Sequence, residues 1–351
     1  MPPRLISNPA DVTTDWLNQV LMHAGSTGRV DDFTANSIGT GQVGENVRFA
    51  LEGTDVPASL VGKFPSADEV SRQTGIAQKN YLREVFFYNQ IQGTVDIQTP
   101  KVLFAEVDEE THNFVIMMED LAPGVQGDQL AGCSADEAAL ALEELAKLQG
   151  PRWGDPALLD YPLLVSAASS PNDLKMIYQM LEPGFAERYA SRLTEDEHRM
   201  VHQVGEVLER YNNIYQAAPG LIHIDFRLDN MMFGGPYPLA VVDWQSLSTG
   251  CPIADVSYFL GTSLAPELRQ KEERHLLRHY LDRLKSYGVQ VREEECLTWY
   301  RNYAPAGLIM AVIASMIVGE TERGNDMFMA MGTRSAQMCR DLDSIKLIRQ
   351  G

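Results

Sequence analysis

The chain is poor in cysteine and in cations, and each shortage excludes a class of protein. Only four cysteines occur among 351 residues, and no two of them form a C-x-x-C pair. Neither a structural zinc site nor a disulfide framework is therefore expected, and this usage is typical of a reducing, cytoplasmic compartment. Lysine and arginine total 29 against 48 aspartates and glutamates, which gives a formal net charge of −19. Proteins that neutralise nucleic-acid phosphates have the opposite balance or a basic tract, so no nucleic-acid polymer is expected as a partner.

A long apolar run is also missing. The most apolar stretch, 304–319, is shorter than the ~20 residues that a helix needs to span a bilayer, so it predicts a buried core helix and no membrane partner. Residues 1–7 lack the apolar segment of a signal peptide. What remains is an ordinary globular composition, with 44% hydrophobic and 22% charged residues. At roughly 150 residues per domain, the length predicts about two domains.

The first part of the chain has the pattern of a small sheet with one inserted helix. Apolar residues on one face predict a leading helix at 9–30. Short, β-prone, alternating segments follow, and a second helical pattern at 79–91 interrupts them. The segments expected to be strands are 46–52, 58–64, 101–107 and 113–118. These patterns predict a mostly antiparallel, β-rich N-terminal lobe at 1–120.

Helical patterns dominate after residue 136, and they predict a larger, mostly helical C-terminal lobe at 121–351. One strand-like stretch, 221–242, interrupts the helices and is dense in His, Asp and Asn. The expected fold class is therefore α+β, with a small β-rich lobe followed by a larger helical one.

The segment 221–233 is the densest group of polar residues in the chain. Apolar residues flank His223, Asp225 and Asn230, and they also flank Asp243 a few residues further on. Carboxylates are tolerated in apolar surroundings only when they are paired, hydrogen-bonded or bound to a metal. Two carboxylates and an amide suit phosphoryl transfer, in which one carboxylate accepts a hydroxyl proton while the other and the amide hold Mg²⁺ on a polyphosphate. The alternative is a hairpin in which these polar residues only cap turns.

The order H-x-D-x-x-x-x-N, followed by two apolar residues and D, resembles the catalytic and metal-binding signature of the kinase-like fold. The chain has His-Ile-Asp-Phe-Arg-Leu-Asp-Asn at 223–230 and Val-Val-Asp-Trp-Gln at 241–245. In these motifs it resembles the aminoglycoside phosphotransferase family, and most of all the choline-kinase-like and ecdysteroid-kinase-like branch of small-molecule phosphotransferases. The resemblance covers 33–262 and implies a two-lobe, protein-kinase-like fold with the nucleotide bound by the first lobe. The family usually has glycine where this chain has Ile224, which places a bulkier side chain beside the catalytic loop.

The resemblance implies a role for each polar residue of these motifs. Asp225 accepts the proton of the acceptor hydroxyl as the γ-phosphoryl group is transferred. Asn230 and Asp243 hold Mg²⁺, and His223 supports the loop through hydrogen bonds. Two roles are open for Arg227: it neutralises the transferring phosphoryl group, or it pairs with a neighbouring carboxylate.

Gly39, Gly41 and Gly44 form a G-x-G-x-x-G pattern. A dinucleotide-binding fold would need a helix directly after these glycines, whereas an alternating strand follows them here. A glycine turn between two strands is the arrangement of a kinase loop over the ATP phosphates. A hairpin turn without a ligand is the alternative.

Lys63 lies in an otherwise apolar strand and shares a strand face with Val61. This arrangement lets Val61 cover an adenine while Lys63 reaches the α- and β-phosphates. The alternative for a lone lysine in a strand is protection of a sheet edge. The likeness of R-E-x-x-F-Y to the family's helix favours Glu84, rather than Glu69, as the partner that orients Lys63.

Two further assignments follow from the resemblance. The segment 115–124 resembles the hinge between the lobes, where main-chain groups near Glu119 and Leu121 meet the adenine edge. Asp255 resembles the family's buried aspartate that braces the catalytic loop. It is also a candidate N-cap for a helix expected to begin at Val256.

The order of these motifs predicts an ATP- and Mg²⁺-dependent phosphotransferase that acts on a hydroxyl of a small molecule, with GTP as the alternative nucleotide. A protein kinase is disfavoured because the stretch between Asp243 and Asp255 is too short for an activation segment and holds neither D-F-G nor A-P-E. The alternative from another class is a nucleotide-binding pseudokinase that acts as a scaffold. Loss of any of four residues would have indicated it, and all four are present: Lys63, Asp225, Asn230 and Asp243.

The class of acceptor stays open at this point. Aminoglycosides need a carboxylate-lined pocket, which an acidic lobe offers, and this interpretation makes the protein a resistance kinase. Choline-type or steroid-type alcohols need aromatic or apolar walls, which Trp299, Tyr300, Tyr303 and the methionine-rich segment 327–338 offer. The form of the motif at 225–233 favours a metabolic hydroxyl kinase. A monomer and a homodimer are both consistent with the sequence.

Overall fold

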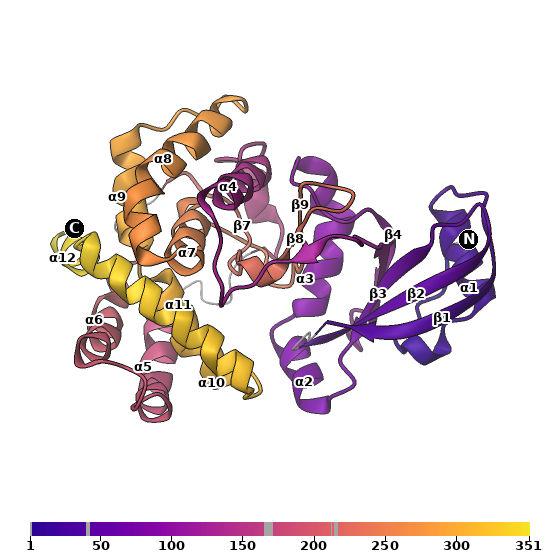
Figure 1. The fold of residues 1–351 in the computed structure, drawn as a ribbon, viewed down its shortest axis with the longest axis horizontal. Coiled ribbons are helices and arrows are strands. Elements are labelled where there is room, and N and C mark those ends of the chain that lie inside the picture. The colour runs from indigo at the N-terminus through magenta and orange to yellow at the C-terminus, as the bar shows by residue number, and fades with distance from the viewer. Residues whose placement is uncertain (1, 40–42, 165–170, 212, 214–216) are drawn as a thin grey trace. The chain divides into compact units, whose positions relative to one another are not determined.

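The computed structural model describes residues 2–39, 43–164, 171–211, 213 and 217–351, and the chain divides into two compact units. The first unit consists of Met1–Thr94, Thr99–Gly124 and Gly234–Ser246, and the second of Val95–Gln98, Val125–Phe233 and Leu247–Gly351. The first unit holds an antiparallel sheet and the second is mostly helical (Figure 1). The predicted α+β class is therefore confirmed.

The sheet of the first unit has the strand order β1-β2-β3-β5-β4, and every neighbouring pair is antiparallel. Lys63 on the central strand faces Asn46 on one side and Ile116 on the other. Because it does not lie at an edge, the interpretation of Lys63 as edge protection is wrong. The strands are β1 (Arg29–Ile38), β2 (Gly44–Thr54), β3 (Ser59–Pro65), β4 (Val102–Val107) and β5 (Phe114–Glu119).

The leading helix is shorter than the predicted 9–30. α1 (Thr14–His23) follows a 3₁₀ turn, η1 (Pro9–Asp11), and ends before Gly25, whose φ of +80° suits glycine. The end of the predicted range already belongs to β1. Most side chains of β1 are exposed, apart from the buried Val30, so the strand shows no apolar alternation by which to recognise it. α1 packs against β1 and β4, and its buried side chains are Trp16, Leu17, Val20 and Leu21.

The helix expected at 79–91 is present as α3 (Asn80–Phe86), which continues into a π-helical turn, η2 (Phe87–Ile91). It is preceded by α2 (Glu69–Ala77), a helix that was not predicted from the sequence. The only buried residue of α2 is Gly75. Without an apolar stripe, the helix has no periodic signal in the sequence.

Helices make up most of the second unit (Figure 1). α10 packs against α5, α7 and α11 and buries Leu308, Ile309 and Val312, so the stretch 304–319 contains the core helix that was predicted. Within the described residues, no helix is long and apolar enough to cross a membrane. The helices are α4 (Ala135–Gln149), α5 (Pro171–Arg188), α6 (Glu195–Tyr211), α7 (Ile253–Ser263), α8 (Pro266–Lys285), α9 (Glu293–Tyr303), α10 (Ala306–Ile317), α11 (Glu322–Asp341) and α12 (Ser344–Gln350).

Short strand pairs frame the polar segment of the second unit. β7 (Gly220–Ile222) pairs antiparallel with β10 (Ser248–Gly250), and β6 (Val125–Gln126) pairs antiparallel with β8 (Met231–Phe233). The loop 223–230 therefore starts at one strand pair and ends at another, so its backbone is anchored at both ends. β9 (Leu239–Val241) belongs to the first unit.

Arg269 on α8 is an almost fully buried cation that joins three helices. It forms ion pairs with Glu273, one turn further along α8, and with Asp341 at the end of α11. The hydroxyl of Tyr300 on α9 donates to Glu273 at 3.0 Å. Only 1% of the Arg269 side chain is exposed, so water cannot replace a lost partner.

Replacing Arg269 with methionine is expected to lower the free energy of unfolding by about 3–5 kcal/mol, because Glu273 and Asp341 would lose a buried counter-ion. Arg278→Met on the same helix breaks a largely exposed ion pair with Glu293, and its cost is expected to stay below about 1 kcal/mol. Urea unfolding followed by circular dichroism measures both losses. Equal losses would contradict the assignment of α8, α9 and α11 to one buried charge network.

Candidate active site

Lys63 is buried in the first unit between two carboxylates. Its Nζ lies 2.7 Å from Oε2 of Glu84 on α3 and 3.3 Å from Oδ1 of Asp243. The Glu84 side chain is 1% exposed and the Asp243 side chain 36% exposed, so this cluster is closed at the helix and accessible at Asp243. Burial disfavours the ammonium ion, but the charges of Asp243 and Glu84 outweigh it and raise the pKa of Lys63. Lys63 is therefore a cation fixed in one position.

The face of α3 that carries Glu84 also holds the segment 243–245. Side chains of α3 donate to the side-chain and main-chain oxygens of Gln245, at 3.3 and 3.1 Å. Trp244 stacks on an aromatic ring at the end of the helix, with 3.7 Å between ring centroids and 8° between ring planes. Residues at i, i+3, i+4 and i+7 lie on one side of a helix, so α3 positions both carboxylates that face the lysine. These residues are Asn80, Arg83, Glu84 and Phe87.

The glycine pattern lies between β1 and β2. Gly39 follows β1 with φ of +72°, Gly44 begins β2, and Gly41 lies outside the described residues. A Cβ atom at Gly44 would lie 3.3 Å from Cε of Lys63, so a larger residue there would press on the lysine. Val61 is half-buried two residues before Lys63, and the alternation of a strand places both side chains on one face.

Glu119 and Leu121 lie at and just after the end of β5. The N–H of Glu119 donates to the carbonyl oxygen of Lys101 at 2.9 Å. Its carboxylate accepts from the N–H of Lys101 and from the hydroxyl of Tyr237, both at 2.7 Å. The carbonyl oxygen of Leu121 accepts from the N–H of Gly124 at 2.8 Å. One main-chain group at each position is thus used within the protein, and adenine contact by the remaining groups stays a prediction.

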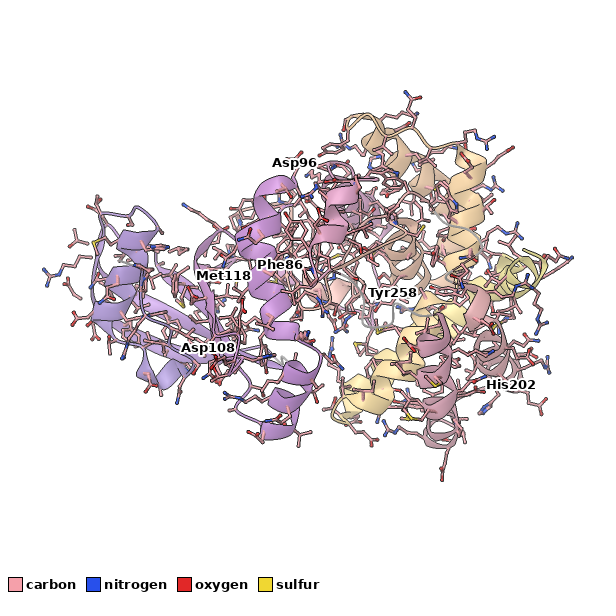
Figure 2. The ribbon with its side chains drawn as sticks, turned by 180° about the vertical axis from the view of Figure 1, so that it is seen from behind. Phe86, Asp96, Asp108, Met118, His202 and Tyr258 are labelled. Carbon is pink, nitrogen blue, oxygen red and sulfur yellow. The ribbon has the colours of Figure 1, made fainter. Side chains whose placement is uncertain are left out.

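Asp225 lies in the second unit with its carboxylate held by three side chains. Tyr258 of α7, which Figure 2 labels among the helices of this unit, donates its hydroxyl to Oδ1 at 2.9 Å. The amide nitrogen of Asn230 donates to Oδ2 at 3.0 Å, and Nε of Arg227 lies 2.9 Å from Oδ1. Burial opposes ionisation, but the Arg227 charge and the hydrogen bonds outweigh it and lower the pKa of Asp225. With 25% of its side chain exposed, Asp225 is an ionised carboxylate in contact with solvent.

Asp255 holds the backbone of this loop from the first turn of α7. Its buried carboxylate accepts the N–H of His223 at 2.7 Å and the N–H of Ile224 at 2.9 Å. Burial raises the pKa of Asp255 to about 7, although both N–H bonds favour the ionised form. Because α7 already begins at Ile253, the alternative of an N-cap at Asp255 is wrong. The imidazole of His223 is itself fully buried.

Ile224 has a left-handed backbone conformation, with φ of +70°. This region is strained for L-residues and most of all for β-branched ones. Glycine adopts it freely, which gives a physical reason for the glycine usual in the resembling family at this position.

Ile224→Gly is expected to be more stable than Ile224→Ala by about 1 kcal/mol, because alanine keeps the left-handed strain and glycine does not. Both variants lose nearly the same apolar side chain, so the loss of packing largely cancels. Ile222 in β7 has no positive φ and serves as the matched control, where alanine should be the more stable of the two. Urea unfolding of the four variants measures the differences. If glycine is the less stable residue at 224 as well, the strain is absent.

Several residues that contact the loop were not identified from the sequence, and Tyr258, Gln129 and Arg323 are among them. Gln129 accepts the N–H of Leu228 through its side chain at 2.9 Å, and Arg323 pairs with Asp229. These partners lie 33 to 99 residues away along the chain. No local spacing could have revealed them.

Apart from the glycines, Val61 and the two hinge residues, the predicted site residues form two groups. Lys63, Glu84 and Asp243 meet in the first unit. The others meet in the second unit around Asp225, and they are His223, Arg227 and Asn230.

The two expected magnesium ligands belong to different groups. Asn230 uses its amide nitrogen for Asp225, so its amide oxygen is the ligand atom, and Asp243 offers a carboxylate that is partly exposed. Two oxygen ligands of this kind fit Mg²⁺, which fills its shell with water and phosphate oxygens. Among the residues that the structure describes, no group of three or more His, Cys, Asp or Glu is arranged to hold a metal ion by itself.

Comparison with known proteins supports the resemblance. The model of the ecdysteroid kinase-like family matches residues 171–291, a range that contains the motif at 223–230, Asp243 and Asp255. No curated protein matches the chain in sequence.

Several solved structures have a similar fold along nearly the whole chain. The choline kinase of Cryptosporidium parvum Iowa II has a TM-score of 0.58 at 9% identity, with 91% of each chain covered. The ethanolamine kinase of Plasmodium vivax has a TM-score of 0.54 at 12% identity, covering 97% of this chain and 93% of that one. The GDP complex of wild-type aminoglycoside 2'-phosphotransferase-IIIa has a TM-score of 0.52 at 14% identity, covering 93% of this chain and 99% of that one. The two-lobe fold of the protein-kinase type, predicted from the motifs, is therefore confirmed.

Proposed function

We propose, from this fold and from the family match that includes the motif, that the protein is an ATP- and Mg²⁺-dependent phosphotransferase acting on a hydroxyl of a small molecule. The observation that carries the proposal is the buried ion pair of Lys63 and Glu84, with Asp243 at 3.3 Å from the same nitrogen. A fixed cation beside an accessible carboxylate suits the binding of a metal-bound polyphosphate. The complexes of the neighbouring aminoglycoside 2'-phosphotransferase with GDP support a nucleotide ligand, and GTP is the alternative to ATP.

In the proposed mechanism, Lys63 binds the α- and β-phosphates and Glu84 fixes the position of its ammonium group. Asn230 and Asp243 would hold Mg²⁺, which supplies positive charge to the phosphate oxygens when it is bound. Asp225 accepts a hydrogen bond from the acceptor hydroxyl. That oxygen bonds to the γ-phosphorus while the bond to the β-phosphate oxygen breaks, ADP leaves, and the hydroxyl proton passes to Asp225.

The surroundings of Asp225 support an acceptor with an apolar body. Tyr258, whose hydroxyl contacts Asp225, belongs to a buried apolar cluster with Met327, Phe328 and Met331. Partly buried apolar residues cover this cluster, and they are Leu130, Ala306, Met310, Ala314 and Val318. A polycation such as an aminoglycoside would need carboxylates at this place instead. The sequence also offered aromatic residues at 299–303 as walls for the acceptor. Of these, Tyr300 and Tyr303 are buried in the core and cannot contact an acceptor.

One observation favours the pseudokinase alternative. Both oxygens of Asp225 already accept hydrogen bonds, from Tyr258, Asn230 and Arg227. A carboxylate has about four acceptor positions, so a hydroxyl can still bind, but the occupied oxygens are also what an inactive scaffold would show.

An ATP-consumption screen with Mg²⁺ tests the proposal. Purified protein is assayed for ADP release with aminoglycosides, amino alcohols, sterols and small sugars, with GTP in place of ATP in a parallel series. A signal that depends on one class of acceptor supports the phosphotransferase. If no acceptor stimulates turnover while ATP still raises the melting temperature, the pseudokinase alternative is favoured.

A further inference from the structure

Four charged residues of the second unit form a line of alternating sign that ends at Asp225. Arg227 lies 2.9 Å from Asp225 through Nε and 3.3 Å from Oδ2 of Asp229 through Nη1. Asp229 in turn accepts two hydrogen bonds from the guanidinium of Arg323, at 3.0 and 2.9 Å. The Arg227 side chain is 16% exposed and that of Asp229 is 9% exposed, so the middle of the line is shielded from solvent.

The start of α11 fixes this line. The main-chain N–H of Gln129 donates to Oδ1 of Asp229 at 3.0 Å, so both oxygens of that carboxylate are bonded. Arg323 and Met327 are one turn apart on α11 and therefore share a face. Sδ of Met327 contacts Nη1 of Arg227, so α11 holds Arg227 directly as well as through Asp229.

We propose that Arg227 is a positioning residue that aims the carboxylate of Asp225 at the acceptor hydroxyl, and that Arg323 is a second positioning residue that acts through Asp229. The proposal rests on the proposed role of Asp225 as proton acceptor. Of the two roles considered for Arg227, pairing with a carboxylate is therefore favoured over neutralising the phosphoryl group. A guanidinium with a carboxylate on each side is already neutralised and is a poor partner for a phosphoryl group. The backbone of the loop does not depend on these pairs, since Asp255 holds its N–H groups.

The experiment compares three single variants and one double variant. The single variants are Arg227→Met, Arg227→Lys and Arg323→Met, and the double variant combines Arg323→Met and Asp229→Asn. Turnover is measured with the acceptor found in the screen, together with the KM for ATP and the melting temperature. Arg192→Met is the control, because Arg192 forms an exposed ion pair with Asp326 of the same helix α11.

For Arg227→Met we expect about 10²-fold lower turnover and an unchanged KM for ATP. Arg227→Lys should restore most of the turnover. Arg323→Met should lose about tenfold in turnover, because the unpaired Asp229 then draws Arg227 away from Asp225. The double variant should recover part of this loss, because the uncharged amide that replaces the carboxylate no longer attracts Arg227. Unchanged turnover in Arg227→Met, a higher KM for ATP in that variant, or a double variant as slow as Arg323→Met would overturn the proposal.

A second measurement does not need turnover. Urea unfolding of Arg227→Met, Asp225→Asn and the variant with both changes measures whether the two side chains stabilise each other. If no acceptor is ever phosphorylated, the proposed function fails, yet a combined variant that loses less stability than the sum of the single losses still supports the pairing of Arg227 with Asp225. Additive losses overturn that positioning whatever the activity.

Discussion

Asp225→Asn is expected to lower turnover by about 10²–10⁴-fold while nucleotide affinity stays nearly unchanged. Asparagine has the same shape but cannot take up the hydroxyl proton. The ionised state of Asp225, maintained by Arg227 and Tyr258, would be lost, whereas Lys63 and Glu84 lie in the other unit and keep their contact. Initial rates give the turnover, and the rise in melting temperature on adding ATP gives the binding.

The control for this variant is Asp282→Asn, which changes an exposed aspartate on α8 that pairs with Lys285. It should leave turnover and the melting temperature unchanged. If Asp225→Asn retains near-normal turnover, Asp225 is not the proton acceptor. If both turnover and ATP binding disappear together, the substitution has damaged the fold, and Asp225→Glu then tests the role.

Lys63→Met is expected to lower turnover on the order of 10²–10³-fold through the loss of a charge at the phosphates. It should also lower the free energy of unfolding by about 3–5 kcal/mol, because Glu84 becomes a buried charge without a counter-ion. Adding Glu84→Gln removes that charge, so the double variant should recover most of the stability and none of the turnover. Urea unfolding and initial rates distinguish the two effects. Similar stabilities of the single and double variants would contradict the buried ion pair.

The stability of Lys63→Met should also depend on pH. Burial raises the pKa of Glu84 above its value in the unfolded chain, and without Lys63 its largest opposing influence is gone, although the hydrogen bond from the main chain of Trp244 stays. A carboxyl with a raised folded-state pKa holds its proton more tightly in the folded protein, so stability falls as pH rises through that pKa. The deficit against the wild type should therefore be smaller at pH 5 than at pH 8. A deficit that does not change with pH would mean that the pKa of Glu84 in the variant is not raised above its value in the unfolded chain.

The elements that were predicted well are those with a regular apolar pattern. The strand around Lys63 is buried over most of its length, and the core helix α10 buries Leu308, Val312 and Ser315 along one face, so pattern and fold agree. β1 and α2 lack such a pattern. Of the ten residues of β1 only Val30 is buried, and its pairing with β2 is made by main-chain groups, which leave no trace in side-chain periodicity.

The same distinction applies to the candidate site. His223, Asp225 and Asn230 are close in sequence, so their resemblance to the family's motif could be recognised from the sequence. Arg323 lies 94 residues from Asp229, and its contact depends on how α11 packs. The strain at Ile224 is a backbone property, so only the departure from the family's glycine pointed to it. The motif that these neighbouring residues form was thus recognisable from the sequence. The contacts with residues far along the chain were not.

The first unit is completed by the segment Gly234–Ser246, which the ribosome makes only after the long stretch Val125–Phe233 of the second unit. Trp244 from this late segment stacks on Phe87 of the early part, and Asp243 is the second carboxylate beside Lys63. Domains commonly fold in order as they leave the ribosome. Here the N-terminal sheet cannot finish its own core in that way, so a nascent chain stalled at residue 124 should expose Phe87. Such a chain is a natural client for chaperones until residue 246 has emerged.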